Sequence, residues 1–222
     1  LPDLMKTEFS NINFRAGGLN HFSILLNVNY KDTGEDGYPM IRKNFENYYS
    51  NLVNDHEGFV SKPGAERGVF KKLFKEYEYL PITTDSHLGE YIQWAYSVAD
   101  HDAILDFYDN YKIKCLNFYN DSVHYDHFFD LSNSETHERV IPIIDAIVGD
   151  LGVEEAAVNL PNENFIECLP SKIVVEVPAK IDNRGIHGIR LNNYPNSFGN
   201  LLNSQVGVIQ LTTEAILKKS KH

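Results

Sequence analysis

Two short segments of this chain carry the side chains best suited to chemistry. In Gly17-Gly18-Leu19-Asn20-His21, the glycines allow a sharp bend or a close backbone approach, and a polar pair follows them. Burying Asn20 and His21 in a strand costs free energy unless a metal, a substrate hydroxyl or a backbone carbonyl serves as partner. From these residues alone, a hydrogen-bonded core histidine is the favoured interpretation of His21, and a ligand is the alternative.

The second segment runs from Thr84 to Tyr91. On a helix, His87 and Tyr91 would share a face because they are four residues apart, and Glu90 would lie three residues from His87. A tyrosine beside a cation has a lowered pKa and can act as a base. By spacing alone, surface hydrogen bonding is the favoured interpretation of these side chains, and base catalysis is the alternative.

Other candidates carry weaker signals. His124 and His127 have a spacing that suits metal binding, but no cysteine or third histidine lies near them. His187 is expected in a turn between strands. Cys115 and Cys168 lie in unrelated contexts, and we interpret them as reduced thiols of an intracellular protein.

The predicted elements that position these residues are strands and helices mixed together, with no regular strand–helix–strand alternation. Asn13 to Tyr30 is predicted as two strands joined by a turn at Gly17-Gly18, and Leu80 to Gly89 as a loop. Helices are expected after Pro39, over Val69 to Tyr77, after Asp100 or Asp102, near Pro142, and over Asn200 to Lys219. Short strands are expected over Ala157–Leu160, Phe165–Cys168 and Ile173–Val177.

This pattern predicts an α+β fold with a mixed sheet and packed helices. Residues 117–136 are polar and aromatic, and we interpret them as a surface insertion. The 222 residues fit one domain, or one and a half. Because the chain opens at Leu1 without an initiator methionine, we expect it to be a trimmed piece of a longer polypeptide.

Composition excludes several classes of protein. The net charge is −11 and basic residues do not cluster, so we expect no nucleic-acid partner. No apolar run reaches the ~18 residues of a spanning helix and no leader pattern is present, so we expect no membrane partner and a cytoplasmic location. The glycine fingerprints that bind nucleotides are absent as well.

Taken together, several segments resemble the C-terminal part of glycoside hydrolase family 4, the NAD- and manganese-dependent glycosidases. Gly18-Leu19-Asn20-His21 is similar to the metal segment of that family, and His87-Leu88-Gly89-Glu90-Tyr91 to the H-x-x-E-Y segment of members acting on non-phosphorylated α-glycosides. Further matches follow in family order, at Asn159-Leu160-Pro161-Asn162, Leu169-Pro170-Ser171, Val174 to Ala179, Gly185-Ile186 and Val206 to Leu217.

The resemblance implies a single C-terminal catalytic and oligomerisation domain over residues 1–222, similar in fold to the lactate dehydrogenase C-terminal domain. The N-terminal Rossmann domain and the cysteine segment that supplies the second metal ligand are missing. The implied cofactors are NAD and manganese(II) or another divalent metal. The implied partners are a glycoside substrate, the missing domain and further copies in a homo-oligomer.

The implied reaction is oxidation at carbon 3 of the sugar, removal of the carbon 2 proton, elimination, water addition and re-reduction. In this mechanism His21 binds the metal, Tyr91 is the base, and Asn20, His87 and Glu90 contact substrate. The fragment alone is expected to be inactive. The alternatives are the substrate domain of a lactate/malate-type dehydrogenase and a non-catalytic assembly domain on the same fold.

Overall fold

A β-hairpin near the start of the chain joins a second set of strands to form one sheet. The computed structural model describes residues 1–50, 67–123 and 139–219. Strand β1 (Ile12–Leu19) pairs with β2 (Phe22–Tyr30), and β4 (Val174–Asp182) pairs with both β3 (Val153–Pro161) and β5 (Gly185–Gly188). Within the described residues, the two sets are joined by the pairing of Gly18 of β1 with Glu176 of β4.

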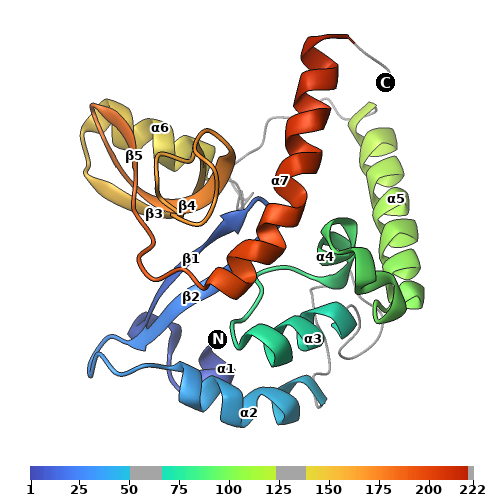
Figure 1. The fold of residues 1–222 in the computed structure, drawn as a ribbon, viewed down its shortest axis with the longest axis horizontal. Helices are drawn as coiled ribbons and strands as arrows, with labels where there is room; N and C mark the ends of the chain where they lie inside the picture. Colours follow the sequence, from blue (N-terminus) through green and yellow to red (C-terminus); the bar gives the residue numbers. More distant parts are fainter. Residues whose placement is uncertain (51–66, 124–138, 220–222) are drawn as a thin grey trace.

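The α+β class predicted from the sequence is confirmed, while the sheet differs from the mixed one expected. Every strand pairing in the described residues is antiparallel, in the order β2-β1-β4-β3 with β5 beside β4. Short turns join β1 to β2 and β4 to β5, which favours antiparallel pairing within these two hairpins, whereas β1 and β4 pair although they lie far apart in the chain. Figure 1 shows the hairpin and the β3–β5 strands as two lobes that adjoin at the end of β1.

Helix α6 lies beside the β3–β5 strands, and the other helices lie around the hairpin or extend away from it (Figure 1). They are α1 (Pro2–Met5), α2 (Tyr38–Ser50), α3 (Gly68–Tyr77), α4 (Asp85–Tyr91), α5 (His101–Val123), α6 (Val140–Gly149) and α7 (Asn196–Leu217), with 3₁₀ turns at Phe9–Asn11 and Gln93–Ser97.

Local signals explain where several helices begin. The Asp36 carboxylate accepts a hydrogen bond of 3.0 Å from the backbone N–H of Tyr38, and Pro39 lies in the first turn of α2 as predicted. The Asp100 carboxylate likewise accepts the N–H of Ala103 at 3.1 Å, so Asp100 caps α5. These bonds satisfy backbone donors that have no partner within the helix.

The core lies between the hairpin, α2, α3, α4 and the first half of α7. Phe22 of β2 is fully buried and packs edge-on against Phe198 of α7, with ring centroids 5.6 Å apart. Phe45 of α2 stacks on Phe74 of α3 at 4.1 Å. Aromatic side chains, which the sequence contains in large number, thus join successive helices to the sheet.

The turn predicted at Gly17-Gly18 is wrong, because both glycines lie inside β1. A Cβ atom on Gly18 would lie 2.4 Å from the carbonyl oxygen of Phe22, and one on Gly17 would lie 2.9 Å from that of Glu176. Glycine is therefore required here for close strand contact. The turn itself is formed by the next residues, Asn20 and His21.

The strand predicted over Phe165–Cys168 is also wrong. These residues form a loop around the side chain of Asn162, which is 1% exposed. The Asn162 amide donates to the carbonyls of Ile166, Leu169 and Pro170, and its oxygen accepts the N–H of Ile166. One buried side chain therefore takes the hydrogen bonds that a strand partner would otherwise supply.

Three further boundaries differ from expectation. Residues 85–89 belong to α4 instead of the predicted loop, because the buried Asp85 and Leu88 anchor a helical turn there. His187 lies in β5, where it pairs with Lys180, instead of in a turn. Helix α5 continues to Val123, so the start of the predicted insertion at 117–136 is helical, and residues 124–136 lie outside the described residues.

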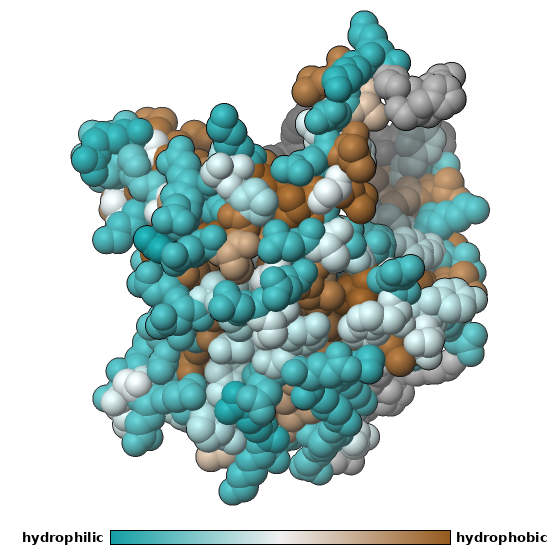
Figure 2. All heavy atoms as spheres, in the orientation of Figure 1, coloured by the Kyte–Doolittle hydropathy of each residue, from teal (hydrophilic) through white to brown (hydrophobic). Residues whose placement is uncertain are grey.

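The second half of α7 leaves the core. Phe198, Leu202 and Val206 are buried, whereas Leu211 is 70% exposed and Ile216 71% exposed. Figure 2 shows apolar residues at the surface along this projecting part of α7. Within the described residues, no helix combines the length and apolar character needed to cross a membrane.

Candidate active site at the β1–β2 turn

The turn between β1 and β2 presents Asn20 and His21 to solvent. Leu19 pairs with Phe22 across the turn, so Asn20 and His21 form a two-residue connection. His21 has a φ of 59°, a left-handed conformation that histidine adopts more readily than most residues. Both side chains are exposed. The interpretation of His21 as a core histidine is therefore wrong, because the polar pair ends the strand instead of interrupting it.

A buried hydroxyl ties this turn to the neighbouring strand. The Ser23 Oγ lies 2.8 Å from the carbonyl oxygen of Leu19 and 2.8 Å from Oε1 of Glu176. A hydroxyl has one proton to donate, so a protonated Glu176 would supply the second hydrogen bond. Burial raises the pKa of the Glu176 carboxyl, while the Ser23 hydrogen bond and the nearby His21 ring oppose that rise.

Helix α4 is fixed in place by a buried carboxylate at its first turn. The Asp85 side chain is fully buried and accepts hydrogen bonds of 3.0 Å from the backbone N–H groups of Val69 and Phe70, at the start of α3. Burial raises the Asp85 pKa, and these hydrogen bonds lower it in part. The carboxylate thus caps α3 from outside that helix and fixes α4 beside it.

The first residue that α4 brings to the turn is His87. Its ring lies against that of His21, with centroids 4.3 Å apart and an angle of 58° between planes. Burial lowers the pKa of His87, and so does the His21 ring, whereas Glu90 acts in the opposite direction. Two imidazoles from distant parts of the chain therefore lie side by side, and His87 favours its neutral form.

Tyr91 lies one helical turn further along α4, on the side of the hairpin. Its ring stacks on that of Phe22, with centroids 5.3 Å apart and 5° between planes, and Phe22 is the residue after His21. The side-chain amide of Gln205 donates to the backbone carbonyl of Tyr91. Burial first, and then the Glu90 charge, raises the pKa of the Tyr91 hydroxyl. In this chain alone, Tyr91 is therefore a neutral phenol.

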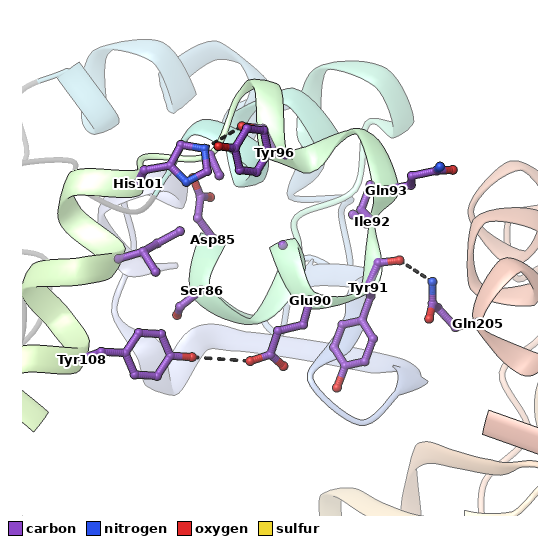
Figure 3. Close-up of a pocket in the computed structure, with 13 residues that line it drawn as sticks. Asp85, Ser86, Glu90, Tyr91, Ile92, Gln93, Tyr96, His101, Tyr108 and Gln205 are labelled. Carbon is purple, nitrogen blue, oxygen red and sulfur yellow. Dashed lines mark hydrogen bonds between the residues drawn. The ribbon is translucent and has the colours of Figure 1, made fainter. Parts of the chain in front are cut away.

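A cavity of about 490 Å³ opens beside Tyr91 (Figure 3). Figure 3 shows the side chains of Glu90 and Tyr91 on one side of it, with Tyr96 and His101 together at another. The Tyr108 hydroxyl donates to Oε1 of Glu90 across 3.4 Å. The walls of the cavity come from α4, the Gln93–Ser97 turn, α5 and α7. The residues that line it are Asp85, Ser86, Gly89, Glu90, Tyr91, Ile92, Gln93, Tyr96, Ala99, His101, Ile104, Tyr108 and Gln205.

The structure thus brings together the side chains that the sequence selected at two separate places. His21 meets His87, and Tyr91 meets the residue next to His21. Sequence reasoning missed Glu176, whose carboxyl reaches the turn from β4. The signal was present, because Glu176 is the one charged residue in the apolar run from Ile173 to Val177.

The donor set at this turn fits part of a metal site. An exposed imidazole at His21 and a second at His87 are suitable ligands for a divalent metal. Within the described residues, no three His, Cys, Asp or Glu side chains gather in a way that could hold a metal ion. Further ligands would have to come from elsewhere. Cys115 and Cys168 are free thiols, and the pair His124 and His127 lies outside the described residues.

Comparison with known sequences matches this chain to glycosidases. Residues 16–222 match a family described as the family 4 glycosyl hydrolase C-terminal domain. An alpha-glucosidase from Erwinia rhapontici is 39% identical over the whole of this chain and 52% of its own length. An alpha-galacturonidase from Thermoanaerobacterium saccharolyticum is 27% identical over 91% of this chain and 45% of its own length. The chain therefore spans about half the length of these relatives.

Comparison with solved structures shows a similar fold. A 6-phospho-alpha-glucosidase from gut microorganisms, solved in complex with NAD and Mn²⁺, superposes with a TM-score of 0.67 at 20% identity. The match covers 99% of this chain and 50% of that one.

Proposed function

The chain belongs to family 4 of the glycosyl hydrolases, as the match over residues 16–222 shows, and from this premise we propose that it is the C-terminal part of a glycosidase. The reaction proposed for the complete protein is hydrolysis of O-glycosides by oxidation, elimination, water addition and re-reduction. The observation that carries the proposal is that His87 lies against His21 while Tyr91 stacks on Phe22, the residue after His21.

NAD and manganese(II), or another divalent metal, are the proposed cofactors. The related gut enzyme was solved with both, which supports the proposal. Bound NAD supplies reversible hydride removal at carbon 3 of the sugar, and the bound metal supplies Lewis acidity toward the oxygen on that carbon. His21 is the proposed metal ligand from this chain. Its exposed imidazole and the neighbouring neutral His87 suit a cation.

Tyr91 is the proposed base for the carbon 2 proton. Once it has lost its own proton, its phenolate oxygen would accept the carbon 2 proton as the glycosidic bond breaks, and would return that proton to carbon 2 when water has added. Because its pKa is raised in this chain alone, Tyr91 needs a nearby positive charge to act as a base. That requirement agrees with a cation bound at the turn beside Phe22.

Three side chains are proposed to bind the sugar. Asn20, at the exposed turn, can hydrogen-bond a hydroxyl beside the metal. His87 lies against His21 and can hydrogen-bond a neighbouring hydroxyl of the sugar. Glu90 is next to Tyr91 in the chain and lines the adjacent cavity. The non-catalytic alternative expected His21 and Tyr91 to face the core, and the exposure of His21 does not favour it.

The test uses the complete protein that carries this chain, with p-nitrophenyl α-glycosides as substrates. We expect hydrolysis only when both NAD and Mn²⁺ are present, and none from residues 1–222 alone. Tyr91→Phe should lower kcat by at least about a hundredfold while the melting temperature changes little, because the ring keeps its stacking on Phe22. Hydrolysis that continues after both NAD and metal are removed would contradict the mechanism.

The exposed apolar side chains of α5 and α7 support the proposal that other protein surfaces pack against this chain. Leu116 on α5 and Leu211 on α7 are 52% and 70% exposed. Large exposed apolar surfaces usually mark contacts with other protein surfaces. We therefore propose that the complete protein is a homo-oligomer in which an N-terminal Rossmann domain covers part of this chain. Light scattering of the complete protein should give a multiple of the chain mass, and a monomer would contradict it.

The two free thiols support a cytoplasmic location as part of the same proposal. Cys115 is exposed and Cys168 half-buried, and neither forms a disulfide. Free thiols are typical of a reducing compartment. Fractionation of cells that produce the complete protein would test this location, and recovery outside the cytoplasm would contradict it.

A further inference from the structure

The cavity beside Tyr91 is separate from the cluster at the hairpin turn. Glu90 and Tyr91 line it, whereas Asn20, His21 and His87 do not. A sugar that reacts at Tyr91 and His21 together must lie at the turn. The cavity is then placed to receive whatever is attached to that sugar.

The lining has the chemistry of a site for an uncharged ligand rich in hydroxyl groups. Tyr96 is 79% exposed and its ring lies 4.5 Å from that of His101, so aromatic surface faces the opening. Glu90 and Gln93 supply polar groups between the apolar walls. Among the lining residues that the structure describes, none is lysine or arginine, so these walls lack the side chains best suited to hold a phosphate group. The volume of about 490 Å³ is typical of small-molecule sites.

One glycine lines this cavity with open space beside it. A Cβ atom added to Gly89 would meet no atom within 4 Å, although Gly89 lies inside α4. Glycine weakens a helix interior, so its presence there usually has a packing reason. A packing reason is visible at Gly68, the first residue of α3, where a Cβ would lie 2.1 Å from the carbonyl oxygen of Val98. Among the atoms that the structure describes, none gives such a reason at Gly89. A side chain there would enter the cavity.

We propose that this cavity is the subsite for the leaving group, and that it takes an uncharged sugar or aryl group released next to Tyr91. Gly89 leaves the space, and Tyr96 provides an aromatic wall for the bound ring. The proposal rests on the proposed function, because it assigns the second half of the substrate in the same reaction.

The experiment compares two substrates of the same sugar in the complete protein with NAD and Mn²⁺. One substrate is the methyl α-glycoside, whose leaving group is too small to fill the cavity, and the other is the p-nitrophenyl α-glycoside. Gly89→Phe should lower the ratio of kcat/KM for p-nitrophenyl over methyl glycoside by about tenfold or more. Gly207→Phe is the matched control, because Gly207 is also helical with open space around it and does not line the cavity.

A second variant tests the wall without blocking the cavity. Tyr96→Ala removes an exposed ring, so the fold should survive, and it should raise KM for the p-nitrophenyl glycoside more than for the methyl glycoside. Equal losses for both substrates in both variants would overturn the subsite. If the unmodified protein cleaves neither substrate, the proposed function fails, and the subsite fails with it. Cleavage of both substrates with an unchanged ratio in Gly89→Phe overturns the subsite alone.

Discussion

Helices α4 and α5 follow one another in the chain and differ in almost every contact they make. Helix α4 has seven residues, and Asp85 and Leu88 within it are fully buried. Helix α5 has 23 residues, yet Leu105 is 63% exposed and Leu116 52% exposed. The short helix is held on several sides and carries Tyr91, while the long helix presents apolar surface. The difference indicates that packing, and not helix length, positions the candidate site.

The largest effect should come from replacing a buried leucine of α4, with an exposed leucine of α5 as the comparison. Leu88→Ala removes a fully buried side chain beneath the site and should lower the free energy of unfolding by about 2–5 kcal/mol. Leu105→Ala removes the same atoms from an exposed position on α5 and should change it by no more than about 0.5 kcal/mol. Urea denaturation of both variants measures the difference. Equal losses would show that α5 is packed as firmly as α4.

The next effect concerns the carboxylate that links α4 to α3. Asp85→Ala leaves the N–H groups of Val69 and Phe70 without their acceptor and should cost about 2–3 kcal/mol. Asp109→Ala, on the exposed face of α5, is the control and should cost less than about 0.5 kcal/mol. If Asp85→Ala were as stable as the unaltered chain in urea, the carboxylate would not be what holds α4.

The smallest effect is a pH dependence at the turn. Since burial raises the pKa of Glu176 in the folded chain, folding favours its protonated form, and this stabilisation is lost as pH rises through the folded pKa. Glu176→Gln stays neutral at every pH. The free energy of unfolding of Glu176→Gln should therefore rise relative to that of the unaltered chain between about pH 4 and pH 7.

Paired urea titrations across that pH range provide the measurement, with Glu163→Gln as the control because Glu163 is exposed. A constant difference between Glu176→Gln and the unaltered chain would mean that the carboxyl is not held in its protonated form.

Local sequence patterns predicted most of the helices because apolar residues recur at helical spacing and two of the helices begin beside a capping aspartate. Asp36 and Asp100 cap their helices, and the buried residues of α3 fall where the spacing places them. The patterns failed where one side chain replaced a regular element. The amide of Asn162 turns an apolar segment into a loop, and an apolar run alone does not show that contact.

The sequence by itself determined the residue types and the family resemblance, including the spacing that sets His87 and Tyr91 one turn apart on a helix. Only the tertiary structure decided that His21 lies on an exposed turn, that its ring meets His87, and that Glu176 reaches the same place from another strand. The physical reason is that spacing along a helix is fixed by local backbone geometry, whereas contacts between distant segments depend on how the whole core packs.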